Sequence, residues 1–242
     1  MEEILTKLQI ATAICDRQPT FLASASWINI PFSHDKPSPT QQLYSEIATL
    51  SLILCQIDSL DSDSSIGNEI AAGELIQTLL EAWRRLCNWE SDLGNKIDFL
   101  GPRPITASQN SLSSTWFSTI SEANGMTHCW SARVICLLEI DKLLQRLPKH
   151  TIIRKELPLD IPADGNRLVS LICASMEYLL QDEMKLFGPA SAIFPAQIAH
   201  AWFKRHRARD KGGLDLLRAI VIRLVHKGLL SAPRLILGED SL

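Results

Sequence analysis

The pattern of apolar and polar residues along this chain repeats mainly with the period of an α-helix. In residues 40–60, for example, apolar side chains recur at intervals of three or four, which places them on one face of a helix. They are Leu43, Ile47, Leu50, Leu54 and Ile57. Comparable stretches predict helices at 2–15, 69–92 (with Ile70 facing inward), 114–122, 127–147, 165–187, 190–207 and 213–228. We therefore expect an all-α protein, an irregular single-domain bundle of about eight helices.

Proline-rich and glycine-rich segments separate the predicted helices. Residues 16–39 carry prolines at both ends, so we expect an extended strap whose apolar side chains dock onto the bundle. These side chains are Trp27, Ile28, Ile30 and Phe32. The predicted organisation is an N-terminal helix and strap over 1–39, an all-helical domain over 40–230 and a tail over 231–242.

Local signals set the expected helix ends. Thr40 and Asp164 are residues of the types that cap helix N-termini, and Gly228 is a common stop signal. The sequence Ala123-Asn124-Gly125 is expected to break the helical pattern. Residues 93–113 contain too much Gly, Pro and Ser for a helix and predict a long connection.

Residues 186–203 form a run of eighteen residues without a formally charged side chain. A run of this length approaches the roughly 18–20 residues that span a bilayer. It also contains Gly188, Pro189, Pro195 and His200, which suit a lipid-facing helix poorly. We therefore predict a buried helix of a bundle and no membrane association.

The composition is ordinary for a globular protein and limits the classes of function. Of 242 residues, 46% are hydrophobic and 21% charged, and the formal net charge is −3. This charge provides no general attraction to nucleic acid, so such binding would need a local basic patch. Residues 204–211 ("KRHRARDK") carry such a cluster, which also suits the C-terminal end of a helix.

The six cysteines are spread along the chain rather than paired at metal-binding spacings. No CxxC sequence is present, and Cys129 and Cys136 lie two helical turns apart. The opening sequence "MEEILTKLQI" has no apolar core of the kind found in secretory signals. We therefore expect free thiols, no metal, no cofactor and an intracellular protein of the nucleus or cytoplasm.

No sequence motif assigns a catalytic chemistry. Phosphate-binding loops, nucleophile elbows and paired histidine metal motifs are all absent from the sequence. Glu139 has Lys142 three residues later and Asp141 has Gln145 four residues later, so both carboxylates are expected on solvated helix faces. His128, at the start of an apolar stretch, is expected to be a hydrogen-bonded interior histidine.

Two segments resemble the carboxy-terminal region of fungal zinc-cluster transcription factors. They are "THCWSARVICLLEIDKLL" (127–144) and "FGPASAIFPAQIAHAWF" (187–203). In that family one helix carries a Trp and, three residues on, an Arg, which Trp130 and Arg133 match. A later helix with a "PL…A…W" pattern is matched by Phe194, Pro195, Ala199 and Trp202. The family also has a six-cysteine zinc cluster that contacts DNA, and these 242 residues contain none, so the chain taken as complete is not expected to bind DNA specifically.

Three functions remain open at this point. The resemblance implies a regulator in a secondary-metabolite gene cluster, acting through a protein partner or a small apolar metabolite. The same helical fold could instead be an enzyme of cyclase type that folds a polyketide or terpenoid intermediate, which needs mainly shape and few polar groups. A remnant without activity is the third. The candidate ligand-binding residues are His128, Trp130, Arg133, Tyr178, His200 and Trp202. The oligomeric state is not predicted.

Overall fold

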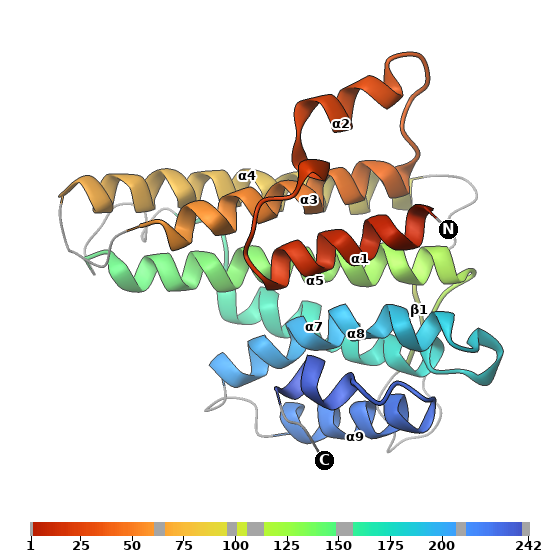
Figure 1. Cartoon of the computed structure of the whole chain (residues 1–242). Helices are drawn as coiled ribbons and strands as arrows, with labels where there is room; N and C mark the ends of the chain where they lie inside the picture. Colours follow the sequence, from red (N-terminus) through yellow and green to blue (C-terminus); the bar gives the residue numbers. More distant parts are fainter. Residues whose placement is uncertain are drawn as a thin grey trace. The chain divides into compact units, whose positions relative to one another are not determined.

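The computed structural model describes residues 2–60, 66–95, 101–105, 114–148, 157–206 and 212–238. Within these ranges the chain is almost entirely helical, so the predicted all-α fold class is confirmed (Figure 1). The chain divides into two compact units. The first comprises Met1–Leu93 and Cys136–Leu159, and the second comprises Gly94–Ile135 and Asp160–Leu242.

In the part of the chain that the structure describes, the first unit consists mainly of helices and includes the end of α5 (Ile120–Arg146) from Cys136 onward. Its elements before the chain crosses to the second unit are α1 (Glu2–Cys15), η1 (Phe21–Ala23), α2 (Ala25–Asn29), η2 (Ile30–Phe32), α3 (Pro39–Asp58) and α4 (Ile66–Gly94, of which Gly94 belongs to the second unit). Helix α1 and the turn η1 both lie against α3. The predicted apolar face of α3 is fully buried, which confirms the helical periodicity.

Helix α3 begins earlier than predicted. Ser38, not Thr40, is the capping residue: its hydroxyl accepts from the Gln41 N–H at 3.2 Å, and the Gln41 side chain accepts from the Ser38 N–H at 2.8 Å. Pro39 occupies the first helical position, where its missing N–H costs nothing. On α4 the predicted inward position of Ile70 is also wrong, because that side chain is exposed.

The segment predicted as an extended strap consists of short helical turns. Ser24 caps α2 by accepting from the Trp27 N–H at 3.3 Å, and η2 follows without a break. Trp27 and Ile30 are exposed rather than docked. The prediction of an extended strap is therefore wrong, because the Ser24 cap closes the backbone into a helical turn; of the side chains expected to dock, Ile28 and Phe32 are half-buried.

The second unit combines a small hairpin with several helices. Its elements are β1 (Arg103–Ile105), β2 (Ser114–Trp116), the first part of α5 (Ile120–Arg146), α7 (Ile161–Leu179), η3 (Asp182–Met184), α8 (Phe187–Arg205), α9 (Gly213–His226) and η4 (Pro233–Leu237). The strands are antiparallel, with Pro104 opposite Thr115. Helix α7 packs on β2 and on α8, and α8 packs on α9 and η4 (Figure 1).

Helix α5 is continuous through the sequence predicted to break it. Thr119 and Glu122 cap its start, and Ala123, Asn124 and Gly125 lie buried inside the helix. Burial of this segment outweighs the low helix propensity of Asn and Gly. The predicted helix at 114–122 is wrong as well, because residues 114–116 form strand β2.

The remaining helix ends show one further correction and one confirmation. Asp160, rather than Asp164, caps α7 by accepting from the Ala163 N–H at 3.1 Å. Gly228, with a positive φ of 92°, follows the end of α9 as predicted. No helix in the described ranges has the combined length and apolar character that a membrane crossing requires.

The predicted C-terminal tail is partly structured. Within 231–238, turn η4 buries Pro233, Ile236 and Leu237. The Gln197 side chain of α8 donates to the Leu235 carbonyl at 2.7 Å, which fixes η4 on α8. Residues 239–242 of the predicted tail lie outside the described residues.

Candidate functional site

All six predicted ligand-binding residues belong to the second unit, and five of them are buried. His128, Trp130 and Arg133 lie on α5, Tyr178 lies on α7, and His200 and Trp202 lie on α8. His200 is the half-buried member of the set. The contacts of each side chain show which of the six lie close together.

Trp130 and Tyr178 belong to one aromatic cluster, formed with Trp116 and Phe117. The Phe117 ring centroid lies 5.4 Å from that of Tyr178 and 6.3 Å from that of Trp130. The Trp116 and Tyr178 rings meet edge to face, with centroids 5.8 Å apart. Such contacts stabilise aromatic pairs beyond simple burial. The hairpin thus brings β2 and the residue after it against α5 and α7.

Glu122 borders this aromatic cluster at the start of α5. The Glu122 N–H donates to the Thr119 hydroxyl at 3.1 Å, and Glu122 Oε2 accepts from the Ser118 N–H at 3.1 Å. The second carboxylate oxygen, Oε1, is buried and has no hydrogen-bond partner among the described residues. Burial raises the pKa of the Tyr178 hydroxyl, and the nearby charge of Glu122 raises it further.

His128 is an interior histidine, as predicted. Its Nδ1 lies 2.8 Å from the Asn124 carbonyl oxygen, and its ring stacks on Phe194 of α8 with centroids 5.5 Å apart. The Asn124 side-chain oxygen is also buried and has no hydrogen-bond partner among the described residues. His128 therefore joins α5 to α8 within the second unit.

Trp202 occupies a different position, against the start of α7. Its indole N–H donates to Asn166 Oδ1 at 2.9 Å, and its ring stacks on His206 with centroids 4.0 Å apart. Gly165 leaves the space that the indole fills. The ring is fully buried, so Trp202 acts as a packing residue that joins α7 to α8.

Arg133 is buried on α5. The basic cluster predicted after α8 is described only in part. Lys204 is exposed and Arg205 is half-buried, whereas residues 207–211 lie outside the described residues.

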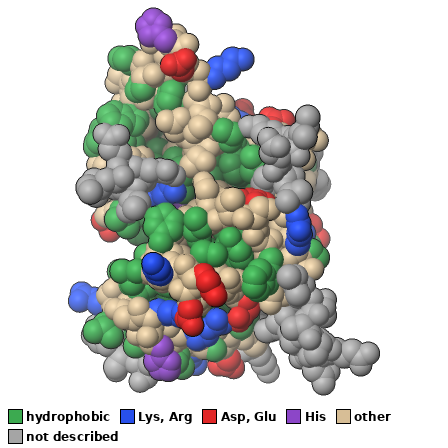
Figure 2. Space-filling view, turned by 90° about the vertical axis from the view of Figure 1, so that its right-hand side faces the viewer, with side chains coloured by type: hydrophobic (Ala, Val, Ile, Leu, Met, Phe, Trp, Pro, Cys, Tyr) green, Lys and Arg blue, Asp and Glu red, His purple; other side chains and the backbone are tan. Residues whose placement is uncertain are grey.

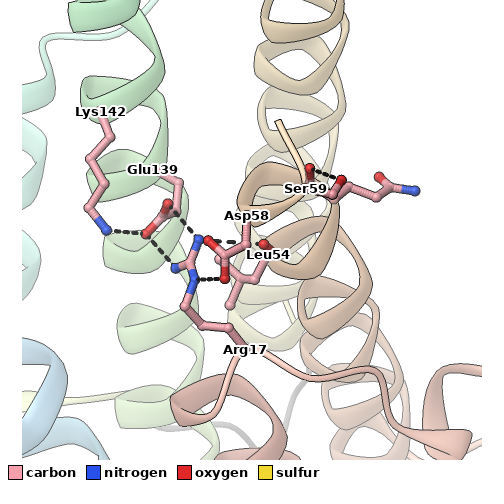
Figure 3. A network of polar contacts seen from close by, with 7 residues as sticks. Arg17, Leu54, Asp58, Ser59, Glu139 and Lys142 are labelled. Atoms are coloured by element: carbon pink, nitrogen blue, oxygen red, sulfur yellow. Dashed lines mark hydrogen bonds and ion pairs between the residues drawn. The ribbon is translucent and has the colours of Figure 1, made fainter. Parts of the chain in front are cut away.

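A separate polar network in the first unit contains Glu139, which was predicted to be solvated. The pairing with Lys142 is present, with Nζ donating to Oε1 at 2.6 Å, but Glu139 is only 3% exposed. Arg17, from the turn after α1, donates to both Glu139 oxygens at 3.0 and 3.2 Å (Figure 3). Arg17 also donates to Asp58 Oδ2 at 2.6 Å. We call these four residues the Arg17 network; it joins the turn after α1 to α3 and α5 within the first unit.

The Arg17 network predicts a pH-dependent contribution of Asp58 to stability. The hydrogen bond from Arg17 lowers the pKa of Asp58 below its usual 3.8, helped by the charges of Arg17, Lys142 and Arg146. A carboxyl with a lower pKa in the folded state stabilises the fold above its usual pKa. This stabilisation is lost as the pH falls through the folded pKa. We expect Asp58→Asn to lower the free energy of unfolding at neutral pH, with the difference from wild type shrinking below about pH 4. Urea unfolding over this pH range measures the difference, and a pH-independent difference would contradict the assignment.

Several residues of the aromatic cluster and of the Arg17 network could not be identified from the sequence. Trp116 and Phe117 fell inside a wrongly predicted helix, although Thr119-Ile120-Ser121-Glu122 matches the capping-box pattern and marks the true helix start. Arg17 gave no local signal, because its partner Glu139 is 122 residues away. Within the described ranges, no group of three or more His, Cys, Asp or Glu side chains is arranged to hold a metal ion.

Comparison with known proteins gives no assignment. No protein-family model, curated protein or solved structure matches the chain. The geometry described above is therefore the basis on which a function can be proposed.

Proposed function

We propose that this chain is a helical regulatory protein that acts through a protein partner, as the resemblance to zinc-cluster transcription factors implies. One observation carries the proposal: side chains predicted to face a ligand are used in internal contacts. Trp202 is bonded to Asn166, and His128 is stacked on Phe194. Enzymes of the cyclase type need a cavity lined by such groups, so this packing favours the regulatory alternative.

An exposed apolar surface in the first unit supports binding of a protein partner. Phe21, Trp27 and Ile30 are 56%, 47% and 68% exposed, and the rings of Phe21 and Trp27 meet edge to face at 5.2 Å. No Asp, Glu, Lys or Arg occurs in residues 18–34 around them. Exposed aromatic side chains are typical anchors of protein interfaces. We call these three residues the α2 surface.

The distribution of charge favours a protein partner over a nucleic acid. Several described basic side chains are paired with carboxylates, as in Arg85 with Glu46 and Arg223 with Glu177. On the face drawn in Figure 2, Lys and Arg side chains lie beside Asp and Glu and among exposed apolar side chains. Specific nucleic-acid binding usually needs a concentrated basic surface. The predicted location in the nucleus or cytoplasm and the role in a secondary-metabolite gene cluster belong to the same proposal.

A gene-replacement experiment tests the proposal. The chromosomal gene is replaced by a Phe21→Ala/Trp27→Ala variant, and transcripts of the neighbouring biosynthetic genes are measured beside those of a deletion strain. We expect transcripts to fall as far as in the deletion strain, because truncation removes the aromatic anchors of the interface. Both side chains are about half exposed, and losing their edge-to-face contact should lower the free energy of unfolding by no more than about 1.5 kcal/mol.

The matched control is Leu230→Ala, which removes an apolar side chain that is 78% exposed in the second unit. Transcripts should stay at the wild-type level in this strain, with protein amounts checked by immunoblot. Normal transcripts in the deletion strain, together with accumulation of a late pathway intermediate, would contradict the proposal and favour the enzyme alternative.

A further inference from the structure

We propose that Trp116, Tyr178 and Glu122 form a binding site for a small organic cation that carries a quaternary ammonium group. This site lies in the second unit and is independent of the α2 surface, so it adds a ligand to the proposed function without depending on it. Three features of the described residues support such a site: the angles between the rings, the unpartnered oxygen of Glu122 and the exposure of Trp116.

The rings of the aromatic cluster provide π faces in different directions. Trp116 and Phe117 stand at interplanar angles of 77° and 68° to Tyr178 rather than lying in a flat stack. A cation is attracted to the face of an aromatic ring, and sites for quaternary ammonium groups are commonly lined by several such rings. The cluster therefore contains several rings of the kind that line such sites, with Trp116 as its exposed member.

Glu122 supplies a negative charge that the described residues leave only partly satisfied. Its Oε2 accepts from the Ser118 N–H, which fixes the carboxylate at the backbone that follows β2. Its Oε1 is buried and has no donor among the described residues. Buried polar atoms in native proteins nearly always have a partner, so an exception calls for an explanation such as an absent ligand. A quaternary ammonium has no N–H to donate, so it would stabilise the carboxylate through its positive charge.

Trp116 marks the open side of the site. It is 36% exposed, whereas Phe117, Trp130 and Tyr178 are all buried. Trp116 is therefore the ring of this cluster through which a ligand from solvent would first make contact. The carboxylate and the ring faces both favour positive charge, which selects a cation over an anion or a neutral ligand.

Calorimetric titration of the full-length protein with choline tests this inference. The control ligand is 3,3-dimethylbutan-1-ol, which has the same shape as choline but a neutral carbon in place of the nitrogen. We expect saturable binding of choline and about tenfold or more weaker binding of the neutral alcohol, as expected when a desolvated cation–π contact is lost. Equal affinity for the two ligands, or no saturable heat with choline, would overturn the proposal.

Two variants assign the binding to these residues. Glu122→Gln should weaken choline binding about tenfold, and Trp116→Ala should weaken it to a similar extent. Gln is also accepted at the third position of a capping box, so α5 should still form in Glu122→Gln. The control is Glu177→Gln on α7, a carboxylate that is paired with Arg223 and should leave choline affinity unchanged. Wild-type affinity in Glu122→Gln would contradict the site, whereas circular dichroism and thermal unfolding identify a loss of affinity that is due to misfolding.

Discussion

Replacing Gly165 with alanine should lower the free energy of unfolding by about 3 kcal/mol, a large effect for a single added methyl group. A Cβ atom at this position would lie 2.0 Å from Cη2 and 2.1 Å from Cζ2 of Trp202. The indole cannot move away easily, because it is fully buried and its N–H is bonded to Asn166. Helix propensity alone predicts the opposite sign, since Ala stabilises a helix interior by about 0.5–1 kcal/mol relative to Gly.

Urea unfolding followed by circular dichroism measures this effect, and two further variants isolate its cause. Gly212→Ala is the matched control, because an added Cβ there has no atom within 4 Å, and it should change stability little. In the Trp202→Leu background the clash is absent. Adding Gly165→Ala to that variant should therefore lower the free energy of unfolding much less than adding it to the wild type. An equal cost of the alanine in both backgrounds would show that the close approach to Trp202 is not its cause.

Removing the buried carboxylate of the Arg17 network should give the other large effect. We expect Glu139→Ala to lower the free energy of unfolding by about 3 kcal/mol, the lower end of the range for breaking a buried ion pair. The loss leaves Arg17 with Asp58 as its carboxylate partner and removes the acceptor of Lys142. The lower end is expected because Arg17 and Lys142 are partly exposed and can be hydrated.

An exposed ion pair in the same unit provides the comparison. Glu46 pairs with Arg85 at 2.7 Å, and both side chains are substantially exposed. Glu46→Ala should therefore cost no more than about 1 kcal/mol in the same urea unfolding experiment. Similar costs for the two alanine variants would mean that burial does not strengthen the Glu139 contacts.

The long helices were predictable from the sequence because each buries one continuous apolar face. The face of α3 from Leu43 to Ile57 is the clearest case, since five regularly spaced residues gave the helix and all are buried. Helix ends were less predictable, because Ser38 and Asp160 compete with equally suitable caps a few residues away. The hairpin was missed because each strand has only three residues, too few for an alternating pattern to be recognised.

Local sequence patterns identified only part of the candidate site. Trp130 and Tyr178 were selected and do share an aromatic cluster, whereas Trp202 and His128 are packing residues in other contacts. The burial of Glu139 could not be predicted, since spacing to Lys142 alone indicates a solvated face. Its environment depends on Arg17, and no local pattern encodes a contact across 122 residues.

The discontinuous composition of the first unit has a consequence for synthesis on the ribosome. This unit contains Met1–Leu93, but its remaining part begins at Cys136, after the chain has contributed Gly94–Ile135 to the second unit. Arg17 is therefore synthesised long before its partner Glu139. Nascent chains generally fold from the N-terminus, domain by domain, and exposed apolar surface is prone to aggregation. The first unit thus cannot be completed before the residues from Cys136 onward have been translated, and until then its earlier helices lack the apolar side chains that this later part contributes.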